Sequence, residues 1–288
     1  MDIYYLLAVS AALSIFFLAS AQDLISREVS DILWIVGGLI AFILIIAGLM
    51  QGKYGSIVSE IWPVALLAFL YADIFIPWKN EGRSVVRYAL GVLLGLTAAY
   101  ELAVHGLQEY SLLFYSMVLW FFFIVLLYKI DIIKGGADAK ALLLLLLLFP
   151  VYPAPLIAAQ PPFFENFTFP LFLSVLLMAA IFSMAVPLWN LLHNAIKHEW
   201  MFPEMLLGRR IEVWKVNLEK HWLLESIDAD GSRVRMRHPG KEDDRKQLDA
   251  IVSARWKRVW VSQKVPFVVP ITAGLLFVLL LGSPLLLL

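Results

Sequence analysis

The chain has no cysteine, which excludes disulfide bonds, thiolate metal sites and cysteine nucleophiles. Its five histidines form neither a His-x-x-x-His pair nor a HExxH motif, so a zinc protease is not indicated. Charged residues make up 16% of the 288, whereas soluble domains carry about 25%. Hydrophobic residues reach 61%, which is typical of a membrane protein. We therefore expect a membrane protein without a metal or other cofactor.

Long apolar runs take up most of the sequence. A span of the bilayer takes about 20 apolar residues. Eight runs approach or exceed this length and predict membrane spans at about 3–22, 32–50, 58–77, 86–105, 111–130, 139–158, 168–192 and 265–287. In the sixth run, Leu142–Leu148 is typical of a lipid-facing helix. Pro150, Pro153 and Pro155 predict a break in its second half.

A polar block separates the last two runs. Arg210–Val216 alternates with the period of a strand, and Asp230-Gly231 between two further strand-like runs predicts a hairpin turn. A short helix within 241–255 and a strand at 258–262 complete the block. We expect an all-α polytopic membrane protein with about eight transmembrane helices and a small α+β domain. Its parts are a helical core with both candidate aspartates at 1–196, the α+β domain at 197–263 and a C-terminal membrane helix at 264–288.

The distribution of Lys and Arg predicts the orientation in the membrane. The short loops on the side that follows the first run hold seven of them, whereas the other side holds only Lys53. The polar block lies on the first side and adds fifteen more. Because positive residues concentrate in cytoplasmic loops, we predict a multi-pass plasma-membrane protein with its polar domain in the cytoplasm and its N-terminus outside. The first run lacks a basic segment before it and a cleavage site after it, so we interpret it as a retained helix.

Two aspartates are the strongest candidates for chemistry. Asp23 lies where the first run ends, and Asp138 lies just before the sixth. A carboxylate at the margin of a membrane helix is costly and tends to be kept for a function. Four predicted spans separate the two, and an even number returns the chain to the same face. Two neighbouring carboxyls, one ionised and one protonated, provide the base and the acid that peptide hydrolysis needs.

Each aspartate also has a purely structural interpretation. Asp23 alone fits an ordinary carboxylate at a helix end, and Asp138 alone fits the N-cap of the helix that follows. Asp73 is expected to pair with a neighbouring Lys or Arg. Lys134 and Lys140 need no role beyond that of positively charged anchors at the cytoplasmic margin.

The polar block suggests lipid as a partner. Arg233, Arg235 and Arg237 alternate along a predicted strand and are suited to face anionic lipid. Acidic residues are interspersed among the basic ones and no nucleic-acid motif is present, so we expect no nucleic-acid partner. The oligomeric state is left open by the sequence.

Three short patches resemble the prepilin peptidases, most closely the archaeal branch that processes preflagellins (archaellins). Asp23 follows a span and is trailed by Arg27 and a short polar stretch, as in that family. Gly135-Gly136-Ala137-Asp138 resembles the Gly-x-Gly-Asp type motif, and Ala139-Lys140 after it resembles the archaeal members. Ala137 replaces the second glycine of the general motif, which agrees with the archaeal branch. The third patch runs from Trp260 to Phe267 and leads into the last span.

The resemblance implies a membrane aspartic endopeptidase with Asp23 and Asp138 as catalytic residues. Gly135, Gly136, Ala137 and Lys140 would support the second motif, and the glycines would let an extended substrate backbone approach. The substrates would be prepilin or preflagellin precursors, cut between a short basic leader and a hydrophobic segment at the cytoplasmic face. The tetracysteine zinc loop of the bacterial enzymes cannot exist here, so their N-methylation activity is not implied.

Two other functions stay open. The first is a proton-coupled transporter that uses the same aspartates, although the sequence shows no internal repeat. The second is an intramembrane protease of the presenilin or signal-peptide-peptidase kind. Such an enzyme would place a Tyr-Asp pair in one span, whereas Asp23 follows Gln22.

Overall fold

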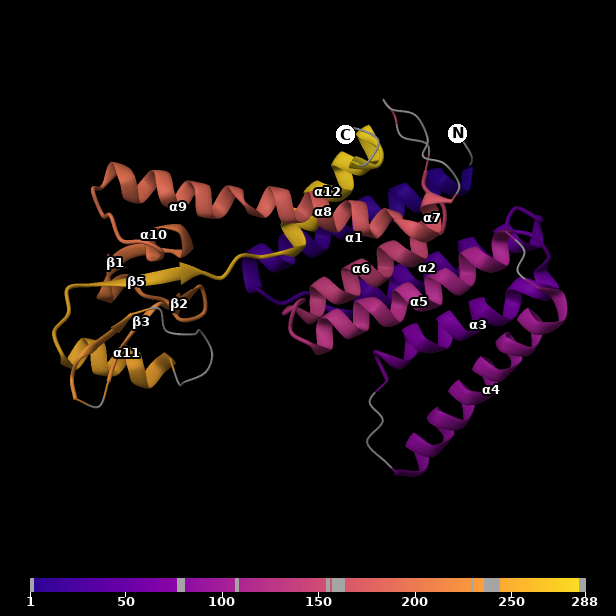
Figure 1. The fold of residues 1–288 in the computed structure, drawn as a ribbon, viewed down its shortest axis with the longest axis horizontal. Helices are drawn as coiled ribbons and strands as arrows, with labels where there is room; N and C mark the ends of the chain where they lie inside the picture. The colour runs from indigo at the N-terminus through magenta and orange to yellow at the C-terminus, as the bar shows by residue number, and fades with distance from the viewer. Residues whose placement is uncertain are drawn as a thin grey trace. The chain divides into compact units, whose positions relative to one another are not determined.

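The computed structural model describes residues 3–76, 81–106, 109–153, 156, 164–228, 230–235 and 244–284. The chain forms two compact units, which are drawn in Figure 1. The first unit comprises Met1–Ala180 and Pro266–Leu288, and the second comprises Ile181–Val265. The last helix of the chain thus belongs to the unit that is built from the first half of the sequence.

The first unit is helical. Its elements are α1 (Ile3–Ser26), α2 (Asp31–Met50), α3 (Ile57–Asp73), α4 (Glu81–His105), α5 (Glu109–Lys129), α6 (Gly136–Leu148), α7 (Glu165–Thr168), most of α8 (Leu171–Ser183) and α12 (Val268–Leu281). A helix occupies each of the predicted membrane runs, because a long apolar segment satisfies its own backbone hydrogen bonds only as a helix when no water is present.

Five segments are long and apolar enough to cross a membrane, judged by length and composition among the described residues. They are Ile3–Ser26, Asp31–Met50, Ser84–Val104, Tyr110–Lys129 and Leu171–Ile196. The predicted mostly helical membrane architecture is therefore confirmed, but the count of eight spans is not. The other three runs form α3, α6 and α12, with 17, 13 and 14 residues. Helix α6 ends at Leu148, just before Pro150, where the prolines predicted a break.

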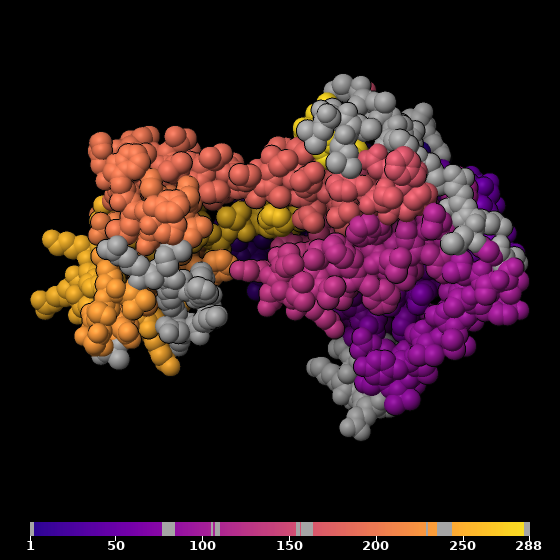
Figure 2. Space-filling view, viewed as in Figure 1, coloured from indigo at the N-terminus to yellow at the C-terminus, as the bar shows by residue number. Residues whose placement is uncertain are grey.

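The outer surface of the first unit is apolar. Figure 2 shows one face of it, on which atoms of α8, α5 and α4 form adjoining bands. Many of the exposed side chains on α4 and α5 are large and hydrophobic, among them Leu93, Leu96, Leu119, Phe122 and Leu126. An apolar surface of this kind is suited to lipid rather than to water.

The core of the first unit is centred on α6. This helix packs against α1, α2, α5 and α12. Every residue from Ala141 to Leu148 is buried by protein, none of them more than 4% exposed. The expectation that Leu142–Leu148 faces lipid is therefore wrong. A helix that is apolar on all sides fits a lipid environment and a protein core equally well, and here its neighbours surround it.

The second unit combines helices and strands. They are α9 (Ala185–Ile196), α10 (Glu204–Leu207), β1 (Arg209–Glu212), a 3-10 turn (Val213–Lys215), β2 (His221–Leu223), β3 (Glu225–Ile227), β4 (Arg233–Arg235), α11 (Asp244–Ser253) and β5 (Arg258–Gln263). The strands form an antiparallel sheet of order β1-β5-β2 and a β3-β4 hairpin. The predicted sheet-containing domain near the C-terminus is confirmed.

Local sequence explains the hairpin of the second unit. Ser226 pairs with Val234, and the Asp228 N–H donates to the Ser232 carbonyl at 3.0 Å. Gly231 has a φ of 82°, which favours glycine, so the predicted turn at Asp230-Gly231 is found. The sheet buries Leu223, Val259 and Val261 against Ile251 of α11, which gives the unit a small core of its own.

Candidate active site

Asp23 lies in the last turn of α1 and binds the first turn of α12. Its side chain is buried, and Oδ2 accepts a hydrogen bond from the backbone N–H of Val268 at 3.2 Å. Val268 is the first residue of α12, and Phe267 before it offers no capping side chain. The carboxylate of Asp23 therefore takes the place of a cap and sits at the positive end of the α12 dipole.

A polar contact one turn earlier joins the same two helices. The hydroxyls of Ser20 and Thr272 are 2.7 Å apart, and Thr272 Oγ1 also donates to the Val268 carbonyl at 2.9 Å. Both side chains are buried. Because hydrogen bonds between buried groups set the register of packed helices, this contact helps to hold Asp23 opposite the start of α12.

Asp138 lies in the first turn of α6, and its carboxylate turns back over Gly135. Helix α6 has Gly135 at its N-cap, so Asp138 is the third helical residue. Its carboxylate accepts a hydrogen bond from the Gly135 backbone N–H. This is the arrangement of the acidic residue in a capping box. The interpretation of Asp138 as the N-cap itself is therefore wrong by three residues.

The two glycines before Asp138 have different environments. A Cβ on Gly135 would lie 2.2 Å from Oδ2 of Asp138, so any side chain there displaces the carboxylate. A Cβ on Gly136 would meet only the Tyr128 hydroxyl, at 3.7 Å. Ala137 packs against the core of the unit. Of Gly135, Gly136 and Ala137, only Gly135 must lack a side chain for the Asp138 carboxylate to keep its position.

The structure brings Asp23 and Asp138 into one region of the first unit. Helix α1 contacts α6, and the charge of Asp23 acts on the carboxyl of Asp138. Asp23 is buried and Asp138 is half-buried. The C-terminal end of α1, the start of α6 and the start of α12 thus converge on two acidic side chains. Two carboxyls that share one proton are in the state needed for acid and base catalysis, and both candidates lie where these helix ends meet.

Arg27 adds a positive charge beside this pair. It follows the end of α1 with a left-handed φ of 61°, and its charge acts on Asp23. Its Nε and Nη1 atoms are buried and have no hydrogen-bond partner among the described residues. A guanidinium with free donors at this position is suited to hold a carbonyl oxygen of a bound peptide.

Lys140 is paired with an acidic residue other than the two candidates. Its Nζ lies 2.5 Å from Oδ1 of Asp31 at the start of α2, and 5.2 Å from the centre of the Phe75 ring. The pair therefore joins the first turn of α2 to the second turn of α6. Asp73 has its own partner in Arg87, at 2.5 Å, as the sequence led us to expect.

Sequence reasoning did not single out Glu60 of α3. Its side chain is fully buried and accepts hydrogen bonds from Ser111 at 2.6 Å and Ser59 at 3.2 Å. A lone carboxylate inside an apolar run is the signal that would have found it. Among the residues that the structure describes, no three His, Asp or Glu side chains are grouped in a way that could hold a metal ion.

Residues 201–283 match a family model described as Archaeal Peptidase A24 C-terminus Type II. No curated protein matches the chain. The matched segment covers the sheet of the second unit and continues through α12, so it includes Val268, the partner of Asp23. The match is confined to this part of the chain, and it supports the resemblance of the sequence to the archaeal prepilin and preflagellin peptidases.

Proposed function

We propose that the chain is a membrane aspartic endopeptidase that removes the short basic leader from prepilin- or preflagellin-type precursors. The observation that carries the proposal is the position of Asp23 at the end of α1 and of Asp138 at the start of α6, two helices that contact each other and α12. The A24 peptidase match supports a hydrolytic reaction, and the motifs around both aspartates support this pair as its site.

The two carboxyls divide the work of hydrolysis. One carboxylate removes a proton from the attacking water, and the protonated partner donates to the leaving amine. The pair titrates as a unit, so the shared proton belongs to neither residue alone. Val268 and Gly135 each donate a backbone N–H to one carboxyl, which holds both groups in position. The second oxygen of each carboxyl is then left to contact the attacking water.

The chain around the pair suits an extended peptide substrate. The space at Gly136 is open, because a Cβ there would meet only the Tyr128 hydroxyl at 3.7 Å, so a peptide backbone can pass close to Asp138 with either glycine or alanine at this position. The buried donors of Arg27 lie on the Asp23 side and can bind a carbonyl oxygen next to the scissile bond. A precursor whose cleavage site lies at the margin of the membrane would present its backbone at the ends of the helices that carry Asp23 and Asp138.

The test is cleavage of a co-expressed archaeal precursor, followed by its change in size. Asp23→Asn and Asp138→Asn should each reduce cleavage to background while the protein still inserts into the membrane, because one carboxyl cannot be both acid and base. Asp73→Asn is the matched control and should keep substantial activity, since Asp73 pairs with Arg87. Near-normal cleavage by either of the first two variants would refute the proposal. If the wild type cleaved no precursor but carried a proton flux, and if the aspartate variants lost that flux, a transporter would be favoured.

A further inference from the structure

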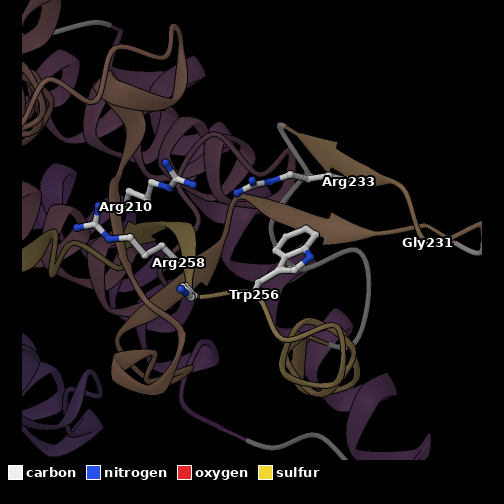
Figure 3. Close-up of a pocket in the computed structure, with 6 residues that line it drawn as sticks. Arg210, Gly231, Arg233, Trp256 and Arg258 are labelled. Atoms are coloured by element: carbon white, nitrogen blue, oxygen red, sulfur yellow. The ribbon is translucent and has the colours of Figure 1, made fainter.

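The second unit contains a cationic cavity that has no role in the proposed peptide hydrolysis. The cavity has a volume of about 530 Å³ and is shown in Figure 3. Four of the six residues that line it are cationic: Arg210, Arg233, Lys257 and Arg258; the other two are Gly231 and Trp256. All six belong to the second unit, whereas Asp23 and Asp138 belong to the first.

Several segments bring the cations together. Arg210 lies on β1, opposite Trp260 of β5, and Arg258 begins β5. Arg233 begins β4, just after the turn at Gly231. Lys257 lies between α11 and β5. Because these segments are spread over the unit's sequence, the concentration of positive charge exists only in the folded state.

The acidic side chains that face these cations do not neutralise them. Arg233 donates to Glu225 at 2.6 Å and lies over the Trp256 ring at 4.6 Å. Glu225 is fully buried and also accepts the Trp260 backbone N–H at 2.9 Å. Arg258 pairs with Glu199. Glu212 lies opposite Arg258 in the sheet, and its carboxylate pairs with Lys215. Among the residues that the structure describes, four cations therefore face three carboxylates, one of which has another cation as its partner, and this leaves an excess of positive charge.

Arg210 is the cation with an unsatisfied donor. Its Nε atom is buried and has no hydrogen-bond partner among the described residues. In Figure 3 the guanidinium groups of Arg210 and Arg233 point toward one another across the cavity. Like charges in this position repel, and a buried donor without an acceptor is costly. An anion between the two groups removes both penalties.

We propose that this cavity binds a phosphate-type group. A guanidinium presents its donors in a planar fork that matches phosphate oxygens in pairs, and such charge-assisted bonds are among the strong ones. A tetrahedral phosphate accepts from several directions at once, which fits the guanidinium groups of Arg210 and Arg233 that arrive from β1 and β4. The ring of Trp256 and the buried Glu225 hold Arg233 in place, so this part of the site is formed before the anion arrives.

A second cavity, of about 520 Å³, adjoins the first. It shares Trp256, Lys257 and Arg258 with the cationic cavity. Its other lining residues are Glu212 and the apolar Val213, Trp214 and Val252. It is suited to the apolar part of a larger molecule that carries the phosphate. A phospholipid headgroup and free phosphate have the same binding chemistry in the cationic cavity, and they are distinguished by experiment.

The first arm of the test uses the full-length protein in a neutral detergent. Inorganic phosphate binding is measured by isothermal titration calorimetry for the wild type, Arg210→Gln and Arg209→Gln. Arg209 precedes Arg210 on β1 and is absent from the lining of the cavity, so it controls for loss of one charge from the same strand. We expect Arg210→Gln to weaken binding about tenfold or more, and Arg209→Gln by less than about threefold.

The second arm measures the retention of phosphatidylglycerol and of phosphatidylcholine on the same proteins by native mass spectrometry. Retention of phosphatidylglycerol that depends on Arg210 and not on Arg209 identifies a lipid headgroup, whereas phosphate binding with the same dependence identifies free phosphate. Either result supports the proposal.

Lys257→Gln guards against a folding defect in Arg210→Gln. Lys257 is exposed, so its replacement leaves the core intact, and we expect about threefold weaker binding. The proposal is overturned if the wild type retains neither ligand. It is equally overturned if Arg210→Gln and Lys257→Gln bind both ligands as well as Arg209→Gln does. Precursor cleavage is not a readout in either arm, so the outcome is independent of the proposed protease activity.

Discussion

Asp23 and Val268 are 245 positions apart in the sequence, and the carboxylate of Asp23 accepts the backbone N–H of Val268 at 3.2 Å. The candidate site is therefore completed by the last helix of the chain. This helix lies in the segment that matches the A24 peptidase model, although neither aspartate does. The matched segment thus supplies a backbone group that holds Asp23 in position.

Replacement of Asp23 should separate this structural contact from the chemistry. Asp23→Asn keeps an oxygen that accepts the Val268 N–H, whereas Asp23→Ala leaves the start of α12 without its cap. We expect Asp23→Ala to lower the free energy of unfolding by about 0.5–2 kcal/mol and Asp23→Asn to lower it less. Unfolding in mixed detergent micelles measures both. Equal stability of the two variants would show that the contact contributes nothing to folding.

The glycines before Asp138 allow a matched comparison. Gly135→Ala should abolish or strongly reduce precursor cleavage, because the new Cβ would lie 2.2 Å from the Asp138 carboxylate and force it to move. Gly136→Ala should keep activity, because its Cβ meets only the Tyr128 hydroxyl at 3.7 Å. Cleavage rates of the purified variants decide the matter. If Gly136→Ala were the more damaging change, the position of the carboxylate over Gly135 would have no bearing on activity.

The ion pair between Lys140 and Asp31 should contribute little to stability. The Asp31 side chain is 57% exposed, and exposed ion pairs are typically worth about 0.2–1 kcal/mol. A double-mutant cycle with Lys140→Met and Asp31→Asn should therefore give a coupling energy within that range. A coupling energy of several kcal/mol would mean that the pair is sequestered from solvent in the membrane.

Single cysteines can test the predicted orientation, because the chain has none of its own. Ser26, Ser56 and Ser232 are all exposed. Cysteines at Ser26 and Ser232 should react with an impermeant maleimide only from the cytoplasmic side, and one at Ser56 only from outside. Labelling of Ser26 and Ser232 from opposite sides would contradict the orientation that was predicted from Lys and Arg.

The second unit should lose stability in mild acid through His221. Burial lowers the pKa of His221 below its ordinary value of 6.5, and the charges of Arg209, Lys220 and Lys264 lower it further. Its Nδ1 also accepts the Asn217 N–H at 3.1 Å, which requires the neutral ring. Because the folded state binds the proton less tightly than the unfolded state, this contribution is present above pH 6.5. It is lost as the pH falls through the lower pKa of the folded state.

The pH dependence of the unfolding temperature measures this effect. His221→Asn should flatten its decline below pH 6.5, whereas the exposed His198, changed to Asn, serves as the control and should leave it unchanged. A decline of the same steepness in His221→Asn and in the wild type would exclude His221 as its cause.

The sequence alone determined the features that depend on neighbouring residues. Apolar runs located the helices, Pro150 marked the end of α6, and the turn at Asp230-Gly231 predicted the β3-β4 hairpin. Helix formation in a membrane and turn formation in a hairpin follow from local composition, because each satisfies its backbone groups within a short segment. The motifs around Asp23 and Asp138 could also be recognised in the sequence, because each consists of a few neighbouring residues.

Only the tertiary structure decided which groups meet. It buried Leu142–Leu148 in the protein, paired Lys140 with Asp31, and placed Asp138 over Gly135 as the third helical residue. It also joined Asp23 to Val268 and gathered cations from three strands around one cavity. These contacts depend on how helices and strands pack, and a local pattern is the same whether its partner is lipid, water or another part of the chain.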